Sequence, residues 1–99
     1  MWYAIVAEDV ENSFEARMTA RPAHLARLTE LQSQGKLLLA GPFPAIDSLD
    51  PGPAGFSGSL IVAEFNDLSE AKNWAEADPF VIAGVYANVT VKPFRKTLP

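Results

Sequence analysis

The chain has 99 residues, 48% of them hydrophobic, which is enough for one domain over residues 1–99 with a buried core and too little for two. A formal net charge of -4 at pH 7, with the basic residues scattered, argues against nucleic acid and anionic membranes as partners. The absence of cysteine and the presence of one histidine exclude disulfides, thiolate nucleophiles and multi-histidine metal centres, whereas a site made of oxygen ligands stays possible.

The first predicted element is a buried strand at Trp2–Ala7, an aromatic and β-branched run. It lacks a basic leader, so we expect a cytoplasmic protein. The polar stretch Glu8–Thr19 is compatible with a loop or with an extra helical turn. Pro22 suits the first turn of a helix, because its missing N–H costs nothing there, and leucines at helical spacing continue to Gly35, a typical C-cap.

The middle of the chain predicts two short strands separated by a long loop. The first strand covers Leu37–Ala40 and is ended by Gly41 and Pro42. The chain over 43–58 carries repeated proline and glycine, which are typical of a loop. The second strand covers Ser59–Phe65.

The last third predicts a helix followed by a strand. A capping-box pattern at Asp67 starts a helix that runs from Leu68 to about Ala77. Asp78 and Pro79 end it, because a residue before proline is pushed out of helical geometry. The final strand, Val85 to about Lys92, alternates apolar and mixed side chains.

This order of elements is the βαββαβ arrangement of a ferredoxin-like α+β sandwich. Its two helices cover one face of the sheet. The strands nevertheless carry apolar residues at both odd and even positions, and so on both faces of the sheet, for example Trp2 with Tyr3, or Leu60 with Ile61. A lone subunit would therefore expose a large apolar surface, and we predict a homodimer with facing sheets, which is a dimeric α+β barrel.

His24 and Asp78 are the candidate catalytic residues. Asp78 follows Trp74 by four residues, so it is expected to continue the inward stripe of the second helix, where a carboxylate needs a partner. Antiparallel helices bring the start of the first beside the end of the second, so the two side chains are predicted to meet. A carboxylate on one imidazole nitrogen leaves the other free for proton transfer. The alternative is a purely structural hydrogen bond between the helices.

Four further residues are candidates for substrate binding. Arg21, with Arg17 as a second choice, would bind a substrate carboxylate through its guanidinium fork, although a solvated loop charge or a salt bridge is an equal alternative. Ser59 offers a hydroxyl, although the glycine beside it is more typical of a bulge. Gly41 and Pro42 would let the backbone approach a cleft. The pattern predicts neither a metal nor a cofactor.

Five segments resemble the YCII-related (YciI) family in their order and spacing. They are "RPAHLARL", "GKLLLAGPFPAID", "AGFSGSLIVAEF", "AKNWAEADPFVIAGVY" and "VKPFRK". The resemblance implies a dimeric α+β barrel, a fold shared with small isomerases, monooxygenases and dehalogenating enzymes. It also implies a cleft built on a histidine and aspartate dyad, here His24 and Asp78. One relative in that family is a dehydrochlorinase of a chlorinated hydroxyquinol.

Residues and resemblance together predict a cofactor-free enzyme in which His24 is the general base or acid and Asp78 orients it. The expected reaction is elimination, isomerisation or hydrolysis of a small acidic or phenolic metabolite. Two other interpretations stay open. One is a non-catalytic metabolite-binding or regulatory module with the same cleft, and the other is a structural barrel that docks onto a larger partner.

Overall fold

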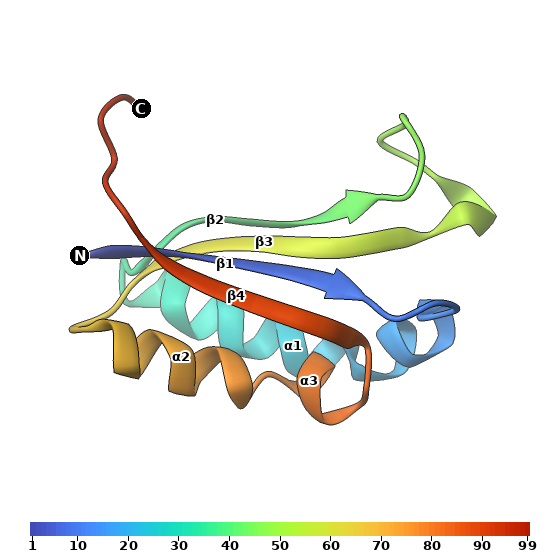
Figure 1. Ribbon diagram of the computed structural model, residues 1–99, viewed down its shortest axis with the longest axis horizontal. Coiled ribbons are helices and arrows are strands. Elements are labelled where there is room, and N and C mark those ends of the chain that lie inside the picture. Colours follow the sequence, from blue (N-terminus) through green and yellow to red (C-terminus); the bar gives the residue numbers. More distant parts are fainter.

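In the computed structural model, which describes residues 1–99, helices cover one face of a four-stranded sheet (Figure 1). The strands lie in the order β2-β3-β1-β4, and every neighbouring pair is antiparallel. The predicted ferredoxin-like α+β sandwich is therefore confirmed. The elements are β1 (Trp2–Asp9), α1 (Phe14–Ser33), β2 (Leu37–Pro44), a 3₁₀ turn (Gly52–Ala54), β3 (Phe56–Glu64), α2 (Leu68–Glu76), α3 (Pro79–Ile82) and β4 (Tyr86–Phe94).

The core lies between the sheet and the helices. Tyr3 and Ile5 of β1 pair with Ala63 and Ile61 of β3, and all four side chains are almost completely buried. Alternate residues of a strand point to the same face, so Ser59, two positions before Ile61, also faces the helices. The helices contribute Leu28, Leu31, Ala71 and Ala75 to this core. The strand pattern thus places a buried hydroxyl at one end of an apolar layer.

Helix α1 begins at Phe14, so the start predicted at Pro22 is wrong. Proline inside a helix costs about 3 kcal/mol, because it removes one hydrogen bond and crowds the preceding turn. Here the carbonyl left without its partner belongs to Met18, which is exposed and can bind water instead. His24 consequently lies in the middle of α1 and not at its start.

Strands β2 and β3 are longer than predicted. β2 continues through Gly41 and Pro42, and β3 begins at Phe56, so the loop predicted over 43–58 is shorter. Proline is tolerated because β2 is an edge strand, where one side of the backbone has no ladder to join. The register pairs Pro42 with Ser59, which brings three of the candidate residues onto neighbouring strands.

The prediction that Asp78 continues the inward stripe of α2 is wrong, because α2 ends at Glu76. Pro79 holds Asp78 in extended geometry, and a new helix, α3, begins at the proline. The Asp78 carboxylate caps this helix by accepting the N–H of Phe80 at 2.9 Å. Asp78 is nevertheless buried, with 2% of its surface exposed.

Helices α1 and α2 lie side by side and run in opposite directions (Figure 1). With 20 residues α1 is about 30 Å long, and α2, with nine, is about 14 Å long. The end of α2 and the start of α3 therefore lie beside the middle of α1, where His24 is. None of the helices is long and apolar enough to cross a membrane.

The close approach of β1 and β3 at Gly58 gives a test of the fold. A Cβ at this position would overlap the carbonyl oxygen of Ala7 and lie 3.1 Å from the ring of Phe43. We expect Gly58→Ala to lower the free energy of unfolding by about 3 kcal/mol in urea denaturation. Gly41→Ala is the matched control, because nothing lies within 4 Å of its Cβ, and should change stability by less than about 0.5 kcal/mol. Equal losses in both variants would contradict this packing.

Candidate active site

His24 and Asp78 are in direct contact. Nδ1 of His24 lies 2.8 and 3.0 Å from the two carboxylate oxygens of Asp78, and the side chains are only 8% and 3% exposed. Because a carboxylate can only accept, Nδ1 carries the ring proton and donates it. Nε2 is then the nitrogen with the free lone pair, and it makes no hydrogen bond to the protein.

Phe80 fixes the orientation of both members of this pair. Its ring stacks on the imidazole with centroids 3.9 Å apart and planes within 10° of parallel. Its backbone N–H holds Oδ1 of Asp78. One residue of the short helix α3 therefore restrains the imidazole plane and the carboxylate together, and the direction of Nε2 is defined.

A cavity of about 200 Å³ adjoins the imidazole, between α1, α3 and the strands β2 and β3. Its lining includes five of the predicted site residues, and the sixth, Asp78, lies behind the imidazole in the second layer. The five are Arg21, His24, Gly41, Pro42 and Ser59. The structure brings all of these residues together, whereas their roles stay predictions.

Arg17 lies in the same cavity wall and is held more tightly than the sequence indicated. Its Nε and Nη2 donate to Asp9 at 2.5 and 3.0 Å. Nη2 also contacts the carbonyl oxygen of Gly58 at 2.8 Å and Oγ of Ser59 at 2.9 Å. Asp9 had no place in the sequence prediction. The alternation of β1 was the available signal, since Asp9 follows buried Ala7 by two positions and so faces the helices.

Tyr86 of β4 is a further polar group beside this network. Its ring meets Phe80 edge-on at 5.5 Å, and its buried hydroxyl makes no hydrogen bond of ordinary geometry. Burial raises the pKa of Tyr86 to about 12, although the nearby Ser59 hydroxyl and the Arg17 guanidinium act in the opposite direction. Tyr86 is therefore a neutral hydroxyl at physiological pH.

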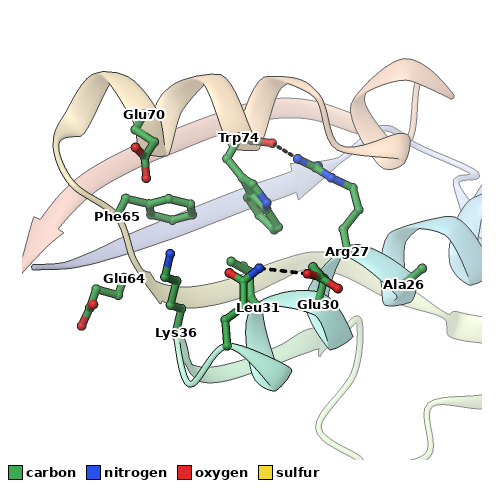
Figure 2. Close-up of a pocket in the computed structure, with 10 residues that line it drawn as sticks. Ala26, Arg27, Glu30, Leu31, Lys36, Glu64, Phe65, Glu70 and Trp74 are labelled. Carbon is green, nitrogen blue, oxygen red and sulfur yellow. Dashed lines mark hydrogen bonds between the residues drawn. The ribbon is translucent and has the colours of Figure 1, made fainter.

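A second and larger cavity, of about 530 Å³, lies away from the dyad beneath α2 (Figure 2). Arg27 reaches across it from α1, with its guanidinium 4.3 Å from the Trp74 ring centroid and Nη2 donating to the Trp74 carbonyl at 2.9 Å. Burial lowers the pKa of Arg27, and the Asp78 carboxylate opposes this effect. This contact joins α1 to the last turn of α2, shortly before Asp78 in the chain. Neither His24 nor Asp78 lines this larger cavity.

Comparison with known proteins agrees with the geometry. The family model described as the YCII-related domain matches residues 1–95. The chain belongs to this family. It is 58% identical over 96 residues to Protein YciI of Escherichia coli O6:H1 and of Shigella flexneri, covering 97% of this chain and 98% of each relative. An uncharacterized protein of Haemophilus influenzae is 54% identical over the same shares of the two chains.

A solved structure of similar fold belongs to an enzyme. It is 5-chloro-2-hydroxyhydroquinone dehydrochlorinase (TftG) from Burkholderia phenoliruptrix AC1100, in complex with 2,5-dihydroxybenzoquinone. The two chains superpose with a TM-score of 0.83 at 27% sequence identity, over 96% of this YCII-related protein and 94% of TftG. The architecture is thus shared with a small-molecule enzyme.

The buried hydroxyl of Tyr86 predicts a dependence of stability on alkaline pH. An unfolded tyrosine ionises near 10, whereas Tyr86 in the folded protein ionises at about 12. Between these values the folded state retains a proton that the unfolded state has lost, so the free energy of unfolding falls as pH rises. Urea denaturation at a series of pH values should show this fall, and Tyr86→Phe should remove most of it.

The tyrosinate absorbance provides the control, because the chain has only two tyrosines. The late ionisation step should disappear in Tyr86→Phe and persist in Tyr3→Phe. A wild-type titration without an ionisation step near 12 would contradict the buried environment of the Tyr86 hydroxyl.

Proposed function

We propose that this protein is a small-molecule enzyme in which His24 transfers protons and Asp78 orients it. The observation that carries the proposal is the geometry of one ring. Nδ1 is held by a buried carboxylate, while Nε2 has no partner in the protein and the imidazole lines a cavity. A structural hydrogen bond alone would not require the second nitrogen to be left free beside a cleft.

The chemistry that follows is general acid and base catalysis. Nε2 accepts a proton from the substrate, and Asp78, 2.8 Å from Nδ1, stabilises the imidazolium that forms. The Phe80 N–H keeps the carboxylate in place during this change of charge. The proton is later returned to the product or to the leaving group. A positioned base of this kind contributes about 100-fold to 10,000-fold in rate.

The proposed substrate is a small acidic or phenolic metabolite, and the reaction is an elimination, isomerisation or hydrolysis. A cavity of about 200 Å³ admits only a small molecule. Exposed Arg21 supplies positive charge at its mouth, and the Ser59 hydroxyl and the Gly41-Pro42 backbone form its walls. The likeness to TftG supports this class, since loss of hydrogen chloride from a hydroxyhydroquinone requires a base.

The proposal includes a homodimer in the cytoplasm. The sheet face without helices exposes four large apolar side chains at alternate strand positions. They are Val6, Leu39, Phe43 and Phe94, with 39%, 46%, 37% and 40% of their surfaces exposed. Together they form an apolar surface that a second sheet of the same kind would cover. Pairing by two-fold symmetry is the simplest such closure.

His24→Asn tests the catalytic role. We expect this variant to lose about 100-fold to 10,000-fold in kcat/KM for chloride release from 5-chloro-2-hydroxyhydroquinone, or for hydrogen exchange at its ring carbons in D₂O. Binding of 2,5-dihydroxybenzoquinone, measured by calorimetry, should change far less. Unchanged turnover in His24→Asn would contradict the proposal. Binding without turnover in the wild-type protein would favour the non-catalytic binding module.

Asp78→Asn should also lower turnover, and the chain offers a matched control. Asp67 is another helix-capping aspartate, whose carboxylate accepts the N–H of Glu70 at 2.8 Å, but unlike Asp78 it does not contact His24. Asp67→Asn should therefore keep its capping hydrogen bond, because asparagine caps a helix about as well as aspartate, and should retain the wild-type rate. Equal loss of rate in both variants would indicate an effect of folding and not of the dyad.

Sedimentation at micromolar concentration tests the dimer. We expect a mass near twice 10.7 kDa for the wild-type protein. Val6→Lys, in the centre of the exposed sheet face, should produce monomers because it would bury an unpaired charge. Ile82→Lys is the control, since Ile82 is 78% exposed on α3, on the opposite side of the sheet. A wild-type mass of 10.7 kDa would overturn the dimer.

A further inference from the structure

Arg17 has donors that the protein itself does not use. A guanidinium carries five N–H groups in one plane. The three N–H groups on Nε and Nη2 serve Asp9, the Gly58 carbonyl and the Ser59 hydroxyl. The two on Nη1 have no acceptor in the protein, and Nη1 is not sealed from solvent. The Arg17 side chain as a whole is only 10% exposed, so these two donors belong to a nearly buried group that the protein holds in place.

The guanidinium of Arg17 is also held in position by aromatic rings. Its central carbon lies 5.0 Å from the ring centroid of Phe80, 5.6 Å from that of Phe56 and 6.0 Å from that of Tyr86. These rings come from three elements, α3, β3 and β4. Together with the ion pair to Asp9 they fix the plane of the guanidinium, and therefore the direction of its free donors.

Arg17 shares its cavity with the dyad. It lies seven residues before His24 on α1, which places both side chains on one face of the helix, two turns apart. Both residues line the same cavity of about 200 Å³, and both contact the ring of Phe80. A small ligand in this cavity therefore lies beside both side chains, whose Nε2 and Nη1 atoms have no partner in the protein.

The charge of Arg17 is already balanced inside the protein. Asp9, whose side chain is 1% exposed, neutralises it at 2.5 Å. The free donors are therefore directed N–H groups next to a neutral ion pair, and not a bare cation that attracts any anion. Fixed donors of this kind are suited to an oxygen on which negative charge develops during a reaction.

We infer that Nη1 of Arg17 binds a phenolic or enolic oxygen of the ligand, the one that becomes negative when His24 removes a proton. An O–H or C–H bond of the ligand breaks, the proton joins Nε2, and the electron pair stays on the ligand and is delocalised onto this oxygen. The ligand class is small hydroxyquinones, phenols and enols. The inference rests on the proposed function for the proton acceptor, whereas the binding of the oxygen is separately measurable.

Calorimetric titration of two quinones tests the inference. The probe is 2,5-dihydroxybenzoquinone, and 2,5-dimethoxybenzoquinone is the control ligand because its methylated oxygens cannot become anionic. Arg17→Lys keeps a positive charge beside Asp9 and loses Nη1, so it should weaken binding of the dihydroxy compound about tenfold or more. The dimethoxy compound should bind weakly and equally to both proteins. Arg95→Lys, the same substitution at an exposed arginine outside the cavity, is the matched control and should leave the affinity unchanged.

Three calorimetric outcomes would overturn the inference. These are unchanged affinity in Arg17→Lys, an equal loss for both quinones, and no binding of the dihydroxy compound by the wild-type protein. Since Arg17→Lys disturbs a buried pair, its fold is checked by circular dichroism, and a second measurement avoids the variant altogether. In wild-type protein labelled with ¹⁵N-arginine, the Nη1 protons of Arg17 should shift on addition of 2,5-dihydroxybenzoquinone. A response confined to Arg21 would also overturn the inference.

Failure of this inference is distinguishable from failure of the proposed function. If His24→Asn loses turnover while Arg17→Lys keeps its affinity for the quinone, the catalytic role of His24 and Asp78 is supported. Binding of the ligand oxygen by Arg17 is then rejected. If the quinone binds through Arg17 but the wild-type protein shows no turnover, binding of the ligand oxygen by Arg17 is supported. The proposed enzymatic function is then rejected.

Discussion

The buried carboxylate of Asp78 is the constraint on which this site depends. It is 2% exposed, and an unpaired charge in that position would cost several kcal/mol. It avoids this cost with two donors from different elements, the Nδ1–H of His24 on α1 and the N–H of Phe80 on α3. The same pair therefore joins the helices and prepares Nε2, so a structural role and a chemical role do not exclude each other.

A second buried ion pair, between Asp9 and Arg17, lies along the same cavity wall. In this pair, as in the pair of His24 and Asp78, the charged groups are balanced inside the protein. One polar atom of each pair has no hydrogen-bond partner in the protein. Those atoms are Nε2 of His24 and Nη1 of Arg17. On the proposed function we therefore expect the cleft to select ligands by directed hydrogen bonds more than by net charge, which agrees with an acidic protein whose other basic residues are scattered.

The comparisons distinguish the fold, which two chains can share at low sequence identity, from the chemistry of the site, which depends on individual side chains. TftG keeps the architecture at 27% identity, with a TM-score of 0.83, while most side chains differ. Burial patterns preserve a fold through such change, but a reaction depends on a few atoms at fixed positions. The comparisons therefore support the family and the fold, and the contacts of His24 and Arg17 support the proposed chemistry.

By itself the sequence determined the order of strands and helices, because hydrophobic alternation and helix caps such as Asp67 are local signals. It also led to the contact of His24 with Asp78, although two premises were wrong, since α1 begins at Phe14 and Asp78 caps α3. Only the tertiary structure decided the setting of Arg17. Its acceptors lie 8, 41 and 42 residues away, and no local pattern brings such distant groups together.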